Sequence, residues 1–488
     1  MPYRRPELQA ILAPCLAVSP EAERLRRCAA LLTSRLALDG FVSTRVYVFN
    51  EPPPARLQVV EGRIVELRIA GADAGLNQRV QRWLRPLLGR VLHLPSLEQD
   101  LRLLQLRPEV RSVRSTLSRL GSDPTQAVLL VKVEASPPRW RGDLSVRNDG
   151  SPGSGEGRAT ASLLRSGALR GGDSLLFYGE LDGNGSFDVG QAIGSVSYTL
   201  PLAQSFSLTG AFGGNRRTSI ELPPPADGLS TTQWQGLGQL EWLLADTLRQ
   251  RWSLSLAYSG TRATTRLDGQ PLPEILPSRL REPRNGYLRL ELTGSGQRPA
   301  LAWFAQAYWL QGIAAATPAD QLAELAFLDI SPGQAAALGG FGSLSWGFSP
   351  RWQANIRAGG QVALRNLTDP MRFSLGSDVG LRGLPGQLIS GDNGWLGTGE
   401  LAWTAWSRSN QALQLVPFLG AGGVLTRLGG LEFRDTVGST GLLGRWLAGE
   451  QWTVELGWVH QFSTAGTEEI WNDWLLGQGL YARVGFRF

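Results

Sequence analysis

Residues able to do catalytic or metal chemistry are few in this sequence of 488 residues. It has two histidines, His93 and His460, and two cysteines, Cys15 and Cys28. Zinc and iron sites draw most of their ligands from these residue types, so we predict no metal site. A hydrolase would need a histidine in Ser/His/Asp geometry, whereas His460 shares its strand face with two aromatic residues. We therefore expect no enzymatic activity.

The two cysteines have a structural use instead. In an exported protein, Cys15 and Cys28 could form one disulfide. This requires their Cα atoms to come within about 7 Å of each other. Two buried free thiols are the alternative, and the sequence leaves both open.

The net charge of +6 comes from arginine, because Lys132 is the only lysine in the sequence. A nucleic-acid-binding surface requires basic residues clustered in a patch or stripe. Here the arginines are scattered, many at alternate positions of strand-like segments. This distribution favours arginines that face a polar lumen or a membrane interface, and we expect no nucleic-acid partner.

The composition indicates a large β-structure in contact with lipid. Sixty glycines and seventeen tryptophans occur together, which fits tight turns and aromatic residues at a membrane interface. The sequence has no run of eighteen apolar residues, so spanning helices are excluded. Spanning strands are not, because alternation leaves each of them only half apolar.

The first part of the chain mixes helices and strands. A helix is expected between residues 19 and 40, since a cap, a proline and an acid open it and a glycine ends it. Strands at 43–49 and 57–66 follow, in the order α-α-β-β. Residues 67–135 repeat this order with an additional opening strand, as β-α-α-β-β. The two repeats predict two small α+β domains, with the boundary at residue 66.

From residue 136 onward the hydrophobic period becomes two. Strands with lipid on one face and water on the other require this alternation. A soluble sandwich alternates too, but its apolar face rarely carries so many tryptophans near strand ends. We count about sixteen such segments, an even number as expected for a single-chain bacterial barrel. The fold class is therefore a membrane β-barrel of about sixteen antiparallel strands over 136–488.

The last strand-like segment, 480–488, places Phe486 and Phe488 on one face and two arginines on the other. A final strand must pair with the first to leave no edge in the membrane. A terminal strand ending in phenylalanine is also the familiar assembly signal of bacterial outer-membrane barrels. We therefore expect outer-membrane lipid and the barrel-assembly machinery as partners.

One connection, 365–394, is about thirty residues long, and loops of this length are usually functional or disordered. Its first motif consists of Leu381, Arg382, Gly383 and Leu384. Its second motif consists of Ser390, Gly391, Asp392, Asn393 and Gly394. Glycine and aspartate in the second motif are typical turn formers, so Gly391, Asp392 and Gly394 are expected to shape the loop.

These motifs, followed by Glu400 and Leu401, resemble the sixth extracellular loop of two-partner secretion transporters. This is the TpsB class, also called the ShlB/FhaC/HecB family of haemolysin activation/secretion proteins. In that family the loop carries Val-Arg-Gly-Tyr or Val-Arg-Gly-Phe and folds back into the lumen. The N-terminal repeats resemble the family's paired POTRA domains, which implies POTRA domains at 1–66 and 67–135 before the barrel at 136–488.

The resemblance also implies roles for single residues. Arg382 is expected to lock the loop across the pore by pairing with an acid of the barrel wall. The family usually has that acid as an aspartate, but Gly420 occupies the position here. Glu400 faces the lumen and is the available carboxylate, while the distance of Glu455 from it is not fixed by the sequence. The alternatives are that Arg382 is a solvated loop arginine and that Glu400 is an ordinary lumen acid. Leu384 replaces the motif's aromatic residue.

The N-terminus departs from the family. A signal peptide, a plug helix and the opening strand of the first POTRA domain have no counterpart in this sequence. Because an outer-membrane protein needs an export signal, we expect Met1 to be an internal or mis-called start.

The resemblance implies a function in type V secretion in a diderm bacterium. POTRA domains in the periplasm would bind a large unfolded exoprotein, the TpsA-like partner, at a strand edge or a helix–strand groove. The partner would then cross the lumen as an extended chain, without a cofactor. The alternative is an outer-membrane assembly and insertion factor of the same superfamily. A passive porin would not explain the POTRA pair.

Overall fold

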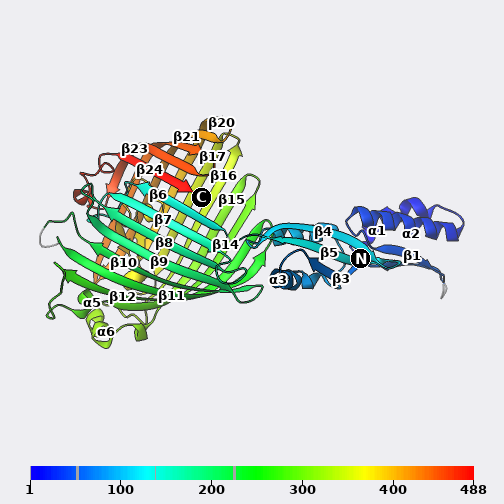
Figure 1. Cartoon of the computed structure of the whole chain (residues 1–488), viewed down its shortest axis with the longest axis horizontal. Coiled ribbons are helices and arrows are strands. Elements are labelled where there is room, and N and C mark those ends of the chain that lie inside the picture. Colours follow the sequence, from blue (N-terminus) through cyan, green and yellow to red (C-terminus); the bar gives the residue numbers. More distant parts are fainter. Residues whose placement is uncertain (1, 51–53, 138, 224–226) are drawn as a thin grey trace. The chain divides into compact units, whose positions relative to one another are not determined.

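The computed structural model describes residues 2–50, 54–137, 139–223 and 227–488. They form two compact units, shown in Figure 1. The first comprises Met1–Arg139 with Leu169–Gly172, and the second comprises Trp140–Ala168 with Asp173–Phe488. The first unit holds helices and short sheets, whereas the second consists mainly of long strands.

The first half of unit one has the predicted order α-α-β-β. Its elements are α1 (Arg5–Leu16), α2 (Glu21–Leu38), β1 (Arg45–Phe49) and β2 (Arg56–Val60). The two strands pair antiparallel, and Leu32 and Leu36 of α2 pack with Val46 of β1 in a buried core. A disulfide joins Cys15 of α1 to Cys28 of α2, with 5.3 Å between their Cα atoms.

The second half of unit one has the predicted order β-α-α-β-β. Its elements are β3 (Arg63–Ala70), α3 (Ala74–Leu84), η1 (Arg85–Leu87), α4 (Leu94–Gln105), β4 (Val110–Leu120) and β5 (Asp123–Ala135). The sheet order is β3-β5-β4, with β3 parallel to β5. Leucines and valines of α3 and α4, among them Leu76, Val80 and Leu97, bury this sheet's face.

The strand expected at 57–66 is two strands that belong to different sheets. The break lies at Gly62, where the chain passes close to Ser43. A Cβ atom on Gly62 would lie only 2.4 Å from the backbone of Ser43. The Gly62 amide donates to the Thr44 hydroxyl at 3.1 Å, which fixes this crossing. The expected domain boundary at residue 66 therefore falls inside β3.

In the described part of the chain, unit two is a closed barrel of sixteen antiparallel strands, as predicted. The wall strands are β6 (Trp140–Arg147), β7 (Gly157–Ser166), β8 (Ser174–Gly183), β9 (Val189–Pro201), β10 (Phe206–Thr218), β11 (Leu229–Asp246), β12 (Gln250–Leu267), β14 (Arg284–Arg298), β15 (Leu301–Gly312), β16 (Ala336–Ser349), β17 (Trp352–Ala363), β20 (Asn393–Arg408), β21 (Gln411–Leu428), β22 (Leu431–Ala448), β23 (Trp452–Thr464) and β24 (Leu480–Arg487). β24 pairs with β6 and closes the barrel.

The barrel wall is apolar outside and polar inside. On β23, Leu456 and Trp458 are 56% and 59% exposed, whereas Glu455, which precedes Leu456, is 2% exposed. An outward apolar face that meets lipid and an inward polar face produce this alternation. Among the described residues, no helix is both long and apolar enough to cross a membrane.

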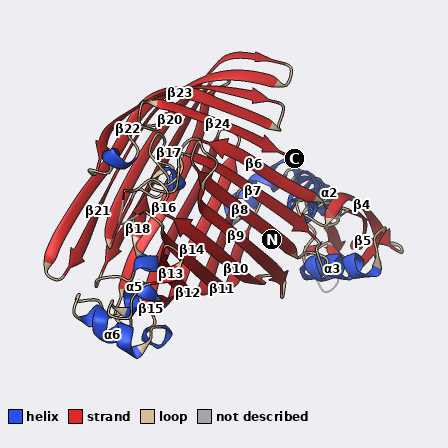
Figure 2. Ribbon diagram, turned by 60° about the vertical axis from the view of Figure 1, so that its left-hand side comes forward, coloured by secondary structure: helices blue, strands red, loops and turns tan. Residues whose placement is uncertain are grey.

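The two ends of the barrel differ. One end has tight turns such as 299–300, 350–351 and 409–410, while the other end carries the longer connections. In bacterial barrels the tight turns face the periplasm. The longer connections contain β13 (Gln270–Pro271), α5 (Ser278–Arg281), η2 (Ala314–Ala316), α6 (Ala319–Ala326) and η5 (Glu468–Ile470). Helices α5 and α6 gather beside the strand ends in Figure 2.

Candidate functional site

The connection between β17 and β20, residues 364–392, is folded inside the barrel, and we call it the lumen loop. It contains η3 (Asp369–Met371), β18 (Phe373–Leu375), η4 (Ser377–Val379) and β19 (Ile389–Gly391). Leu381 and Leu384 are fully buried and pack against Leu396, Val424 and Val437. These three residues belong to the inward face of the wall, so the loop occupies the lumen. Leu384, which replaces the aromatic residue of the motif, fills this apolar cluster.

Arg382 reaches from the loop to two carboxylates of the wall. Its Nε donates to Glu400 Oε1 on β20, and its Nη1 donates to Glu455 Oε2 on β23 at 2.9 Å. Arg445 on β22 completes the group, with its Nε 2.7 Å from Glu455 Oε1 and its Nη2 3.5 Å from Glu400 Oε2. The expected neighbours Arg382 and Glu400 are therefore brought together, and Glu455 and Arg445 join them.

The backbone of the motif is held as well. Ser439 Oγ donates to the carbonyl of Arg382, and Gln461 Nε2 donates to the carbonyl of Gly383 at 3.0 Å. Gly383 has a φ of 72°, and a Cβ there would lie 2.1 Å from Val459 Cγ1. A larger residue at this position would be strained and would collide with the wall.

Gly420 lies where the family resemblance places an aspartate. Its position on β21 is covered by the loop, since a Cβ there would lie 3.2 Å from Leu381 Cδ2 and 3.3 Å from Thr398 Cγ2. The loop leucine occupies the space that an acidic side chain would need. Glu400 and Glu455 supply the carboxylates for the loop arginine instead.

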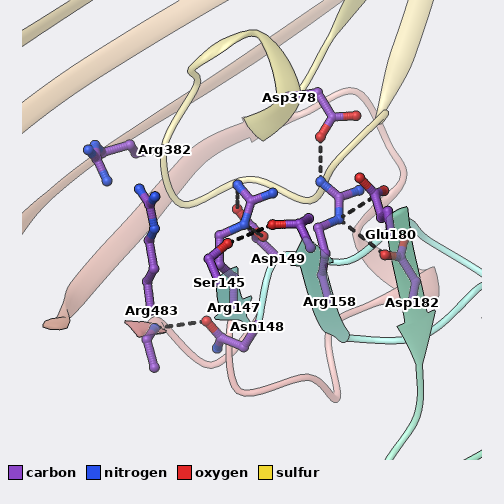
Figure 3. A network of polar contacts seen from close by, with 12 residues as sticks. Ser145, Arg147, Asn148, Asp149, Arg158, Glu180, Asp182, Asp378, Arg382 and Arg483 are labelled. Atoms are coloured by element: carbon purple, nitrogen blue, oxygen red, sulfur yellow. Dashed lines mark hydrogen bonds and ion pairs between the residues drawn. The ribbon is translucent and has the colours of Figure 1, made fainter. Parts of the chain in front are cut away.

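A second ionic group holds the loop at Asp378, as Figure 3 shows. Arg158 on β7 has a fully buried side chain and bonds to Asp378 through Nη1. Its Nε lies 3.2 Å from Asp182 Oδ1 and 3.5 Å from Glu180 Oε1, both on β8. Its Nη2 donates to Ser151 Oγ at 3.1 Å. Arg158 is therefore a buried cation that joins the loop to two wall strands.

This second group was missed in the sequence analysis. The even spacing of Glu180 and Asp182 on one strand indicates that both face the lumen. Spacing does not show which cation they surround, because Arg158 and Asp378 are 220 positions apart. Removing one partner of a buried ion pair usually destabilises a protein by about 3–5 kcal/mol. Arg158 is therefore a strong structural anchor.

The second loop motif lies at the base of the loop. The Asp392 carboxylate is buried and accepts from Leu367 N and Arg427 N, each at 3.3 Å, and from Arg372 Nε at 3.4 Å. A Cβ at Gly391 would lie 2.8 Å from Val424, and one at Gly394 would lie 2.2 Å from the Phe373 ring. Asp392 thus joins both ends of the loop to β21. The two glycines allow Val424 and the Phe373 ring to pack against the backbone on either side of it.

The remaining candidate residues lie away from the lumen. His460 stacks on Trp458 at 6.1 Å on the outer face. Phe486 lies 5.9 Å from Phe488 and 4.6 Å from Trp452, also outside. Within the described residues, no cluster of His, Cys, Asp and Glu is suited to a metal ion.

Comparisons with known proteins agree with this arrangement. CdiB from Escherichia coli superposes with a TM-score of 0.70 at 16% identity, over 100% of this chain and 88% of that one. CdiB from Acinetobacter baumannii gives 0.66 at 14% identity, over 99% and 86%. BamA from Haemophilus ducreyi lacking POTRA domains 1-3 gives 0.58 at 14% identity, over 100% and 98%. At these identities the likeness shows the fold.

Sequence comparison identifies the family. A search of curated proteins found no match. The family model described as haemolysin secretion/activation protein ShlB/FhaC/HecB matches residues 126–427. These residues include most of the barrel, the lumen loop and the Arg382 motif. This chain therefore belongs to the ShlB/FhaC/HecB family of outer-membrane transporters of the two-partner secretion type.

Proposed function

We propose that this protein recognises an unfolded exoprotein in the periplasm and secretes it through its barrel. The observation that carries the proposal is the lumen loop, which lies in the path of any passing chain and is fixed to the wall by ion pairs at Asp378 and Arg382. Charge-assisted hydrogen bonds contribute about 1.5–3 kcal/mol each. A differential affinity of about 5.5 kcal/mol moves a two-state equilibrium from 1:99 to 99:1. Arg382 makes two such bonds and Asp378 makes one, so the anchors are of the same order as the differential affinity that binding of a polypeptide can supply.

The first N-terminal domain supports recognition of an extended chain. In the described part of the chain its sheet has two strands, and neither outer edge pairs with a further strand. An extended peptide can add to such an edge through backbone hydrogen bonds. Tyr47 and Phe49 on β1 are 40% and 39% exposed and alternate with the core residues of that strand. They offer aromatic contacts for alternate side chains of the added strand.

Secretion of a co-expressed partner tests the proposal. The best candidate is a large exported protein encoded beside this gene. Cells that carry the transporter are expected to release the partner into the medium, and cells without it are expected to retain it in the periplasm. Equal release in both strains would contradict the proposal.

The alternative, an assembly factor for other barrels, is favoured by one observation. The closing strands pair over Arg483–Arg487 and Asp143–Arg147, whereas β21 and β22 pair along their whole length. A weakly paired seam is a place where another strand could add. Depletion of an assembly factor would lower the amounts of many outer-membrane barrels, whereas depletion of a secretion transporter should affect one partner.

A further inference from the structure

A cavity of about 370 Å³ lies in the lumen against the lumen loop. Three arginines line it: Arg357 on β17, Arg382 in the loop and Arg445 on β22. Among the described residues that line it, Glu400 is the one carboxylate. Ser345 and Asn355 add neutral polar groups. The cavity therefore carries an excess of positive charge.

The cavity lies on the side of the loop that faces the tight turns. Ser345 and Asn355 precede and follow the turn at 350–351 and are closer to it along their strands than Arg357. The apolar cluster of Leu381 and Leu384 lies toward the other end, against Leu396 and Val424. A chain that enters from the end with tight turns therefore meets the cavity before it meets the apolar part of the loop.

Arg357 differs from the other two arginines. It is exposed, and within the described chain no carboxylate lies within ion-pair distance of it, whereas Arg382 and Arg445 each bond to Glu400 and Glu455. Its guanidinium reaches the loop, since a Cβ at Gly380 would lie 2.8 Å from Arg357 Nη1. Because Arg357 has no carboxylate partner and lies beside two paired arginines, it can bind an additional anion.

We propose that this cavity binds an acidic segment of the exported polypeptide. A carboxylate of that segment pairs with Arg357, and a second one competes with Glu400 for Arg445 and Arg382. An arginine that exchanges one carboxylate for another never loses its counter-charge, which avoids the large penalty of an unpaired buried ion. The incoming chain thereby loosens the loop that blocks it. This inference rests on the proposed export function and names the chemistry that the lumen recognises.

Binding of short peptides to the full-length protein in detergent micelles tests the proposal. The probes are fluorescein-labelled Gly/Ser peptides that carry six glutamates, six lysines or no charge, and the measurement is fluorescence anisotropy. The glutamate peptide is expected to bind and the other two are not. Arg357→Gln should weaken its affinity roughly tenfold, because one charge-assisted contact is lost. Binding should also fall as salt is added.

Arg251→Gln is the matched control. Arg251 faces the lumen from β12, where it lies 3.6 Å from Glu241 and outside the cavity lining. Arg251→Gln removes the same charge from the lumen as Arg357→Gln does, but it leaves the cavity intact. The peptide affinity should therefore stay unchanged. Equal weakening by both variants, or equal binding of the glutamate and lysine peptides, would overturn the proposal.

A parallel secretion assay separates this inference from the export function. If the wild-type protein secretes its partner and Arg357→Gln secretes it at the same rate, the acidic site is disproved and export stands. If the wild-type protein secretes nothing, the export function fails, and peptide binding still decides whether the cavity selects acidic chains.

Discussion

Arg158 on β7 and Asp378 in the lumen loop are 220 positions apart in the chain and form an ion pair inside the barrel. Arg382 of the same loop bonds to Glu455 on β23 at 2.9 Å. β24 and β6, the strands that close the barrel, lie between these two anchor strands. The loop therefore connects the wall on both sides of its most weakly paired seam.

Asp378→Asn should loosen the loop without harming the barrel. The change removes one of three carboxylates around Arg158 and leaves Asp182 and Glu180 in place. The expected loss of anchoring is about 1.5–3 kcal/mol. Planar-bilayer recordings should show longer open times. Asp369→Asn is the control, because this loop carboxylate is 84% exposed and pairs only locally with Arg372 in the described chain. Identical open times for the two variants would exclude the anchor.

Arg382→Ala should abolish or strongly reduce secretion while the barrel still assembles, as judged by heat-modifiable migration on gels. Glu400→Ala should act in the same direction. The double variant should be little worse than Arg382→Ala, because both changes break the same contact between Arg382 and Glu400. Additive effects would mean that Glu400 acts elsewhere. Normal secretion by Arg382→Ala would remove the functional role of the motif.

Asn148 should be required to close the outer end of the seam. Its Oδ1 accepts from Ala482 N and its Nδ2 donates to Leu480 O, both at 2.8 Å, so the carboxamide continues the backbone ladder where β6 ends. Asn148→Ala should speed hydrogen exchange at the Ala482 amide, and Asn148→Asp, which keeps the acceptor, should do so less. The Phe488 amide, bonded to Gly142 O at 3.0 Å at the other end of the seam, is the internal reference.

The cysteine pair should resist alkylation. Both residues are buried, and the structure joins them across α1 and α2. The native protein without reductant should therefore take up no iodoacetamide, even after unfolding, and reduction should make both thiols reactive. Closing a loop of this size contributes about 3 kcal/mol, so Cys15→Ser should lower the unfolding midpoint of unit one. Alkylation of the unfolded, unreduced protein would rule out the bond.

The barrel could be predicted from the alternation along its strands, whereas the loop contact followed from the family resemblance. Alternation shows which side chains face inward and places Glu400 in the lumen, and the resemblance of the loop motif brings Arg382 near it. Alternation does not show at what height two distant strands face each other. The pairing of Arg382 with Glu455 depends on the register of several strands, and so does that of Arg158 with Asp378. These contacts could not be predicted without the closed barrel.

The strand expected at 57–66 shows a different limit. Its alternation breaks at Glu61, Gly62 and Arg63, but this break does not show that the two halves belong to different sheets. The change of sheet follows from the close approach of Gly62 to Ser43 and from its bond to Thr44, which are contacts of the folded domain. A glycine within a strand pattern often marks such a close backbone approach.

An aspartate at position 420 should replace Glu400 only when the loop gives it space. Gly420→Asp in the otherwise unchanged protein should push against the buried Leu381 and loosen the loop, since the new Cβ would lie 3.2 Å from Leu381 Cδ2. With Glu400→Ala and Leu381→Ala, the same aspartate has room and Arg382 lacks one partner. Secretion should then recover part of what Glu400→Ala with Leu381→Ala loses. Gly420→Asn has the same shape without the charge and should give no recovery. Recovery by asparagine would show that filling the space matters, whereas no recovery by aspartate would show that the acid at this position cannot reach the loop arginine.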